Sequence, residues 1–292
     1  MVGKSIKKWW PVFLLPTAVA FAIGFVWPFI WGIYLSFCKF TTVKNVKFIG
    51  FSNYSKVFAD PTFSHAFWLT VLFAFLSSVL INILAFAIAL ALTRGLKGTN
   101  VFRTIFFMPN LIGGIVLGYI WQTLLNGLLS KWGQPLLALS AFNGFWGMII
   151  LLCWQQIGYM MIIYIAGLQA IPTDMLEAAE IDGATKTQTL FRVIIPNVMP
   201  SITICMFLSI TNGFKLFDQN LALTAGQPFI MNPDGTTIKT TEMLALNIFN
   251  TFYNSNAASR GTAQAKAVLF FILVAAIGLV QLQFTRKREV QQ

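Results

Sequence analysis

Six long apolar segments constrain the fold of this chain more than any other feature of its sequence. They cover residues 11–37, 67–93, 104–126, 145–170, 197–216 and 267–285. A helix needs roughly 20 apolar residues to cross the core of a bilayer, and backbone groups in lipid must be satisfied within each segment. The alternating pattern of a membrane barrel is absent. The sequence therefore predicts an all-α integral membrane protein with six transmembrane helices.

The composition supports this fold class. Hydrophobic residues make up 57% of the 292 residues and charged residues only 10%, which is more apolar surface than a soluble domain of this size can bury. The net charge of +11 could suit nucleic acid, but the basic residues stand in short groups at the ends of apolar segments. We therefore expect a lipid bilayer, and not nucleic acid, as the partner.

The first apolar segment follows a group of lysines and could be mistaken for a secretory signal. It carries no charge from Trp9 to Cys38, which is longer than the core of a cleavable signal, and it offers no clear small-residue cleavage site. We therefore expect a retained helix at 11–37 after a short N-terminal segment at 1–10.

Basic residues also predict the orientation. With a cytoplasmic N-terminus, the inner segments hold eleven of the 20 basic residues, mostly hard against helix ends, where the positive-inside rule acts. Both termini, including the tail at 286–292, are then expected in the cytoplasm of a multi-pass cell-membrane protein whose core spans 67–285. The long segments 38–66 and 217–266 are expected outside, where loops of such length are usually functional or mobile.

A charged segment between the fourth and fifth spans, Pro172–Pro200, interrupts this apolar chain. Pro172 ends the preceding span, and Thr173 or Asp174 is expected to cap a short helix, since Asp174 and Glu177 have capping-box spacing. The alternative is a solvated loop whose charges serve solubility alone.

The same segment predicts a helical elbow parallel to the membrane. Gly183 suits a left-handed cap at which the chain reverses, and a second helix is expected from about Lys186 to Ile194, ended by Pro196. The residues expected to meet a cytoplasmic partner are Glu177, Ala178, Ala179, Glu180, Asp182, Gly183 and Pro196.

The order Glu177-Ala178-Ala179, Gly183, Ile195-Pro196 closely resembles the EAA loop of ABC importer permeases, through which they bind their ATPase subunits. Further stretches resemble the sugar-type branch of that family, which includes the maltose and glycerol-phosphate importer permeases. They are FIGFSNY (48–54), FRTIFFMPN (102–110), GYIW (118–121) and LFDQNLALTAGQP (216–228). The resemblance covers about 10–285. It departs from the family where Ala225 and Gln227 flank Gly226, since Gly-Gly-Pro is common there.

The resemblance implies an ABC type I importer permease of the MetI-like fold, with a cytoplasmic coupling helix in the elbow 172–196. Such a bacterial permease forms half of a translocation pore. Its partners would be a second homologous permease, two ATPase subunits and an extracytoplasmic solute-binding protein. The chain has no Gly-x-x-x-x-Gly-Lys-Ser/Thr phosphate loop, so it is expected to be no enzyme and to hold no cofactor, with ATP bound by the partner subunits.

Uncharged polar residues within the spans are candidates for the substrate pathway, because burying them in a membrane is costly and tends to mark a route. Amides and aromatic rings suit a sugar. The candidates are Asn110, Gly114, Gln155, Gln156, Tyr159, Ser209 and Asn212. The alternative for each residue is a contact between helices, worth about 0.6 kcal/mol, and both interpretations stay open.

Other functions fit less well. A secondary transporter needs an ionisable group within a span, but none of the acidic residues lies in mid-span, and Asp218 is expected to pair with Lys215. An intramembrane enzyme needs histidines or clustered carboxylates, but His65 is the only histidine. No catalytic or metal site is therefore expected. A sugar, expected to be an oligosaccharide, is the leading cargo. A polyol or glycerol-phosphate solute is the alternative, although an anion would favour buried basic residues.

Overall fold

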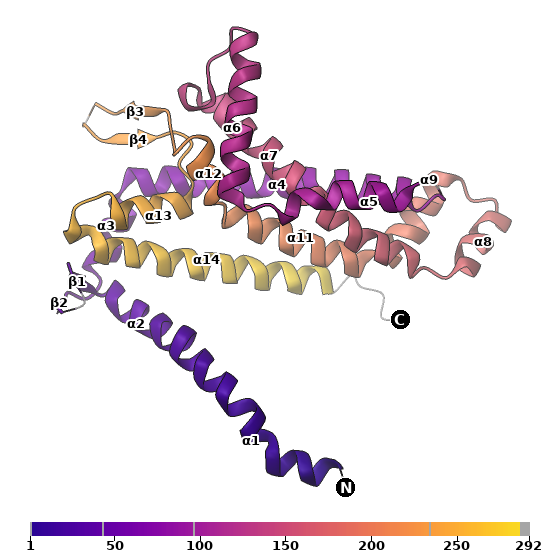
Figure 1. Ribbon diagram of the computed structural model, residues 1–292, viewed down its shortest axis with the longest axis horizontal. Coiled ribbons are helices and arrows are strands. Elements are labelled where there is room, and N and C mark those ends of the chain that lie inside the picture. Colours follow the sequence, from indigo (N-terminus) through magenta and orange to yellow (C-terminus); the bar gives the residue numbers. More distant parts are fainter. Residues whose placement is uncertain (1, 43, 96, 234, 287–292) are drawn as a thin grey trace. The chain divides into compact units, whose positions relative to one another are not determined.

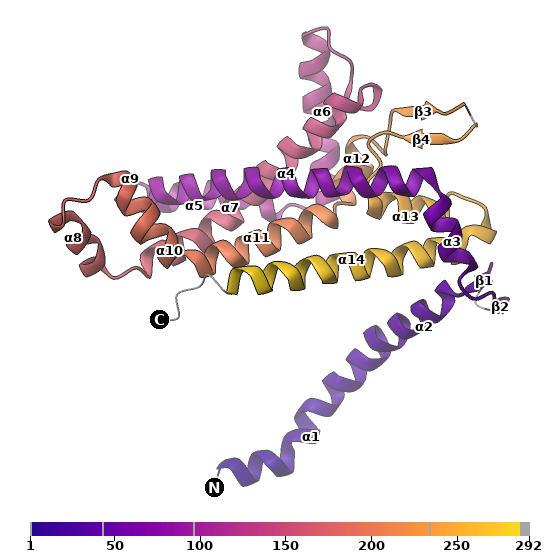
Figure 2. The ribbon, with the colours of Figure 1, turned by 180° about the vertical axis from the view of Figure 1, so that it is seen from behind.

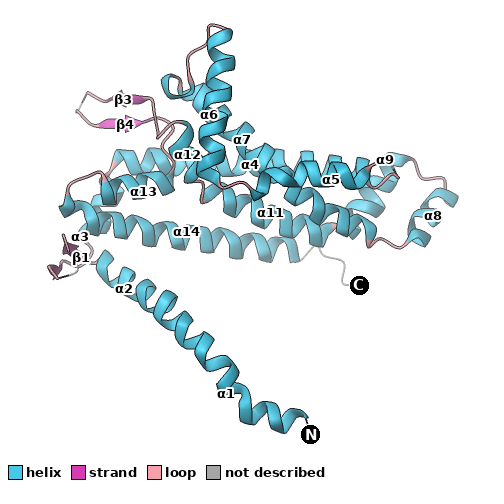
Figure 3. Cartoon of the chain, viewed as in Figure 1, coloured by secondary structure: helices cyan, strands magenta, loops and turns pink. Residues whose placement is uncertain are grey.

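Helices dominate the computed structural model, which describes residues 2–42, 44–95, 97–233 and 235–286 (Figures 1 and 3). The α-helices are α1 Val2–Phe21, α2 Trp27–Ser36, α3 Ser52–Ala59, α4 Pro61–Leu92, α5 Thr99–Phe107, α6 Gly114–Lys131, α7 Ala141–Gln169, α8 Thr173–Ile181, α9 Lys186–Thr189, α10 Ile195–Asn197, α11 Met199–Phe214, α12 Asp218–Leu223, α13 Leu244–Tyr253 and α14 Arg260–Arg286. The described strands form antiparallel hairpins, β1 Cys38–Phe40 with β2 Val46–Phe48 and β3 Phe229–Met231 with β4 Thr237–Lys239.

The chain divides into two compact units, each with its own contacts. The smaller consists of Met1–Asp60 with Ile248–Phe271, and the larger of Pro61–Asn247 with Ile272–Gln292. The predicted N-terminal segment 1–10 is described from Val2 onward and belongs to α1. The predicted tail 286–292 lies, apart from Arg286, outside the described residues.

Within the described residues, four helical stretches are long and apolar enough to cross a membrane, and up to six if each of two bent pairs is one span. The four are Trp9–Ser36, Pro61–Leu92, Ala141–Gln169 and Ala257–Gln281. They lie over the first, second, fourth and sixth predicted segments. The helical membrane class is confirmed, and the bent pairs are compatible with six spans.

The third predicted span, 104–126, is broken near its middle and is not the continuous helix expected. Thr99–Leu111 meets Gly114–Lys131 at an angle of 103°. Pro109 lies in the 3₁₀ turn that ends the first arm, and a proline lacks the backbone N–H that would continue a helix. Ile112 and Gly113 then take extended backbone angles, so the chain changes direction before α6.

The fifth predicted span, 197–216, corresponds to α11, with a bend at its start. The helical segment Lys186–Asn197 meets Met199–Phe214 at 71°. Pro196 and Pro200 lie on either side of this bend, and each removes a backbone donor. The two arms of the elbow therefore lead into α11 through a proline-flanked corner.

In the smaller unit, buried polar contacts hold the segment that follows α2. Asn53 on α3 donates from Nδ2 to the carbonyl oxygens of Ser36 and Cys38, at 2.8 and 2.9 Å. Lys266 on α14 donates to Asp60 at 2.8 Å, and the lysine side chain is only 2% exposed. The sequence placed Lys266 in an outer loop, but α14 begins at Arg260, so this lysine is a buried, paired residue.

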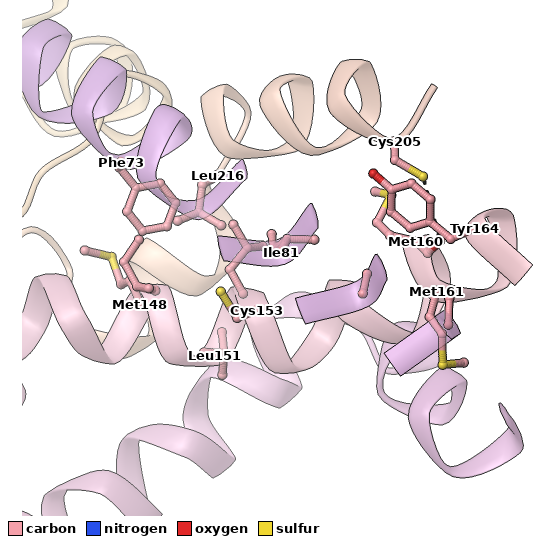
Figure 4. Close-up of a cluster of buried hydrophobic side chains, with 14 of the residues drawn as sticks. Phe73, Ile81, Met148, Leu151, Cys153, Met160, Met161, Tyr164, Cys205 and Leu216 are labelled. Carbon is pink, nitrogen blue, oxygen red and sulfur yellow. Dashed lines mark hydrogen bonds between the residues drawn. The ribbon is translucent and has the colours of Figure 1, made fainter. Parts of the chain in front are cut away.

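The core of the larger unit lies where α4, α7 and α11 pack together. Small residues allow a close approach: a Cβ added to Gly213 of α11 would lie 2.8 Å from the Cα of Ala74 in α4. In Figure 4, Met160 and Tyr164 of α7 lie beside Cys205 of α11. Other members of this buried cluster are Phe73, Ile81, Met148, Leu151, Cys153, Met161 and Leu216.

A polar network also joins these helices inside the core. Tyr164 of α7 donates from its hydroxyl to Oδ1 of Asn82 on α4 at 2.6 Å. Asn82 donates from Nδ2 to the hydroxyl oxygen of Ser209 on α11 at 2.8 Å, and that hydroxyl lies 2.6 Å from the hydroxyl of Ser78. Each polar group is thereby satisfied away from water, which fixes how the three helices align.

The larger unit has distinct ends. In both Figure 1 and Figure 2, α8 and α9 lie beyond one end of α4, while the β3–β4 hairpin lies towards its other end. The predicted outer segment 217–266 is not an unstructured loop, since it contains α12, this hairpin and α13.

Candidate functional site

The first arm of the elbow is helix α8. Its N-cap is Pro172, with no side-chain hydrogen bond to the first turn. Thr173 and Asp174 are thus inside the helix and do not cap it as expected, because the chain already turns helical at the residue after the proline. Asp174 lies in the first turn, where its negative charge still favours the helix.

The structure confirms the prediction that Gly183 forms a left-handed cap after α8. Gly183 has a φ of 74°, in the left-handed region that favours glycine. Its amide donates to the carbonyl of Glu180 at 3.0 Å, and the amide of Ala184 donates to that of Ala179 at 3.0 Å. These bonds form a Schellman motif, which ends the helix and reverses the chain.

The second arm begins with a capping box. The amide of Thr185 donates to Oε1 of Gln188 at 2.7 Å, and the amide of Gln188 donates to the hydroxyl of Thr185 at 3.3 Å. A π-helical turn, Leu190–Ile194, then leads into α10. Pro196 lies inside α10 at one of its first positions, where proline is tolerated, and does not end a helix at Ile194 as expected.

The elbow presents acidic and apolar groups together on its surface. Ala178 and the carboxylates of Glu177, Glu180 and Asp182 are exposed, while Ala179 is half-buried. Ile181 is 86% exposed, although the sequence analysis did not select it. An isoleucine between two acidic residues, Glu180 and Asp182, was the sequence signal that could have marked Ile181 as a contact residue. Such a surface can dock into a groove that is apolar in its centre and basic at its rim.

Two of the predicted pathway residues are buried among other protein groups. Gln155 on α7 is 6% exposed, accepts from Nε2 of Gln219 at 2.7 Å and donates to the carbonyl of Ile112 at 3.3 Å. Ser209 belongs to the network around Asn82. Their polar groups join helices to one another in this structure.

Other predicted pathway residues are half-exposed. Asn212 on α11 donates from Nδ2 to Oε1 of Gln156 on α7 at 2.9 Å, and both side chains are partly open, as are Tyr159 and Asn110. Gly114 provides room for a neighbouring helix, since an added Cβ would lie 2.8 Å from Cβ of Asp218. The structure therefore brings Gln156 and Asn212 together and keeps Gly114 against α12.

Residues 83–290 match the family described as the binding-protein-dependent transport system inner membrane component. The chain belongs to this family. It is 40% identical, over 97% of its length and 96% of the relative's, to the probable starch degradation products transport system permease protein AmyD of Thermoanaerobacterium thermosulfurigenes. It is 30% identical to the multiple sugar-binding transport system permease protein MsmF of Streptococcus mutans, over 99% of both chains.

A solved structure shares the fold of this permease. A chain of a bacterial ABC transporter involved in the import of the acidic polysaccharide alginate superposes with a TM-score of 0.79, at 21% identity and over 98% of both chains. The predicted permease fold is thereby confirmed.

The permease also has buried polar residues that the sequence analysis missed. Asn220 on α12 donates from Nδ2 to the carbonyl of Thr241 at 2.8 Å and accepts from the amide of Met243 at 3.0 Å. Nearby, Ala225 has a φ of 51°, a left-handed angle that favours glycine. Ala225 is one of the two residues, with Gln227, that flank Gly226 where the chain departs from the common Gly-Gly-Pro pattern.

The expected ion pair between Lys215 and Asp218 is absent from the described part of the chain. Ion pairs there join Lys239 with Glu242 at 3.8 Å and Lys266 with Asp60 at 2.8 Å. Lys215 is the exposed residue at the C-cap of α11, whereas Asp218 is half-buried beside Gly114. His65, which was expected in or near a loop, lies within α4, and its Nε2 is 3.1 Å from the carbonyl oxygen of Thr240.

Proposed function

We propose that this permease forms half of the translocation pore of an ABC importer that moves an oligosaccharide into the cell. Relatives named for starch degradation products and for multiple sugars support a saccharide cargo. The family name supports delivery of that cargo by a binding protein. A second, homologous permease would complete the pore, and two separate ATPase subunits would hydrolyse ATP.

The observation that carries the proposal is the form of the elbow. Its arms are fixed by a Schellman turn at Gly183 and by a capping box at Thr185. A short helix can transmit displacement only if its ends are held, and these hydrogen bonds hold them. When the ATPase pair closes on binding ATP, it would move α8. The spans α7 and α11, which the elbow connects, would then shift between outward-open and inward-open arrangements.

The orientation follows from the same assignment. If α8 meets an ATPase in the cytoplasm, the β3–β4 hairpin at the other end of the larger unit faces outward, towards the binding protein. The basic residues of the inner segments support this orientation through the positive-inside rule. Both termini would then lie in the cytoplasm.

The pathway for the sugar is proposed along the partly open faces of α7 and α11. Gln156 and Asn212 offer amide donors and acceptors to sugar hydroxyls, and Tyr159 offers a ring to the apolar face of a pyranose. Gln155 and Ser209 are buried behind these faces, so they would shape this route and not contact the sugar.

The test is purification of the assembled importer from its native cells. We expect the permease to bring down an ATP-hydrolysing protein and a second permease. The binding protein encoded with them should bind an oligosaccharide in calorimetry, and deletion of the permease should abolish uptake of that sugar. Purification with no ATPase would overturn the proposal, and a binding protein selective for a polyol phosphate would replace its cargo.

A further inference from the structure

A cavity of about 570 Å³ lies between the elbow and the ends of two spans. Its walls come from the C-terminal ends of α4 and α7 and from the helices α8 and α9. Its volume is in the range of small-ligand sites, about 300–1,000 Å³. None of the predicted pathway residues lines it, so it is separate from the proposed route of the sugar.

Aliphatic side chains from α4, α7, α8 and the turn after α9 line the interior of the cavity. Leu90 comes from α4, Leu168 from α7, Leu176 from α8 and Leu190 from the π-helical turn after α9. Because α4 and α7 end at this cavity, it lies where membrane-spanning helices give way to the polar elbow. An apolar interior at this depth suits a hydrocarbon chain.

The lining of this cavity also includes two basic residues. Arg94 follows the end of α4, and Lys186 begins α9. The described lining residues include no carboxylate, and within the described chain neither cation has an ion-pair partner within 4.0 Å. The guanidinium fork of arginine matches two oxygens of a phosphate, and lysine adds a second positive charge.

We propose that this cavity binds an anionic phospholipid, with its phosphate between Arg94 and Lys186 and an acyl chain against the leucines. Basic pockets at the cytoplasmic ends of spanning helices attract acidic headgroups, which are concentrated in that leaflet. The lipid would bridge α4 and α7 to both arms of the elbow, so that the coupling element and the spans move together. This inference rests on the proposed cytoplasmic orientation of the elbow.

The experiment counts lipids retained by the intact importer. The purified complex is stripped of lipid, supplied with phosphatidylglycerol or phosphatidylcholine, and examined by native mass spectrometry. The test variant is Arg94→Gln with Lys186→Gln. The matched control is Lys97→Gln with Arg192→Gln, which removes two exposed cations from the same end of the unit but outside the cavity lining.

We expect the wild type and the control variant each to retain one phosphatidylglycerol per permease, and the test variant to lose it. None of the three should retain phosphatidylcholine in this way. Leu190→Trp, which fills the cavity without changing charge, should also lose this lipid. Equal retention by the test variant, or displacement of the lipid by inorganic phosphate alone, would overturn the proposal. Loss of the ATPase subunit from the test variant would assign the cations to a protein contact instead. Because lipid retention needs no transport, a wrong cargo would leave this result unchanged.

Discussion

The amide of Ala184 donates a hydrogen bond to the carbonyl oxygen of Ala179 at 3.0 Å, and this bond closes the turn between the arms of the elbow. It forms only because Gly183, between the two arms, has a φ of 74°. The angle between the arms therefore depends on a backbone conformation that other residues adopt at a cost.

Replacement of Gly183 by valine should uncouple the elbow without unfolding the permease. No atom lies within 4 Å of an added Cβ, so the effect is on the backbone, at about 1–2 kcal/mol for a left-handed angle. We expect normal insertion into the membrane but loss of sugar uptake. Gly133→Val is the matched control, since Gly133 has a φ of 64° and the same open surroundings away from the elbow. Normal uptake by Gly183→Val would remove the coupling role of this turn.

Glu177→Lys should prevent docking of the ATPase. The carboxylate is exposed on α8, so reversal of its charge disturbs a complementary basic surface while leaving the fold intact. Co-purification of the ATPase with tagged permease measures the effect. Glu177→Gln is the milder control and should retain part of the complex. Equal recovery of the ATPase with Glu177→Lys would show that this charge is not at the interface.

Tyr164→Phe should destabilise the core of the larger unit. The hydroxyl donates to Oδ1 of Asn82 at 2.6 Å in a fully buried position, and its removal leaves a buried acceptor without this donor. The expected loss of unfolding free energy is about 1–3 kcal/mol. It falls to about 0.6 kcal/mol where the polar groups also find hydrogen-bond partners in the unfolded state within the membrane. Thermal unfolding of the purified permease measures it. Tyr119→Phe, on the exposed face of α6, should leave the midpoint unchanged.

Asp60→Asn should destabilise the smaller unit more than the double replacement Asp60→Asn with Lys266→Met does. The lysine is almost fully buried, so removal of the carboxylate 2.8 Å from its Nζ breaks a buried ion pair, at about 3–5 kcal/mol. Replacement of both residues removes that charge and restores much of the stability. Thermal unfolding of both variants and of Lys56→Met, an exposed lysine on α3, tests the order. A double variant as unstable as the single one would contradict it.

The sequence predicted the helical class and the turn at Gly183 because both follow from local rules. Apolar length specifies a span, and a glycine after a short helix specifies a left-handed cap. It did not predict the break at Pro109, since the apolar stretch continues through the proline and conceals the change of direction. Nor did it predict the burial of Lys266, because the partner Asp60 is distant in sequence and only the folded chain brings them together.

The sequence also could not predict which of the polar pathway residues are buried and which are partly open. Gln155 and Gln156 are neighbours with the same side chain, and their difference depends on which face of α7 packs against other elements. Gln155 meets Gln219 at 2.7 Å in a buried position, whereas Gln156 meets Asn212 at 2.9 Å at a partly open one. The spacing of residues along one helix cannot supply that distinction.

This division gives a prediction about cargo. Gln156→Leu with Asn212→Leu removes both partners of one hydrogen bond, so little stability should be lost, while a sugar loses amide groups along its route. We expect a lower rate of oligosaccharide uptake at unchanged thermal stability. Gln155→Leu should do the reverse, because it leaves the amide of Gln219 without an acceptor at a buried position, which costs about 1–3 kcal/mol. Uptake normalised to folded permease should then resemble wild type. If Gln156→Leu with Asn212→Leu transports normally while Gln155→Leu changes sugar selectivity, the route lies on the α12 side of α7.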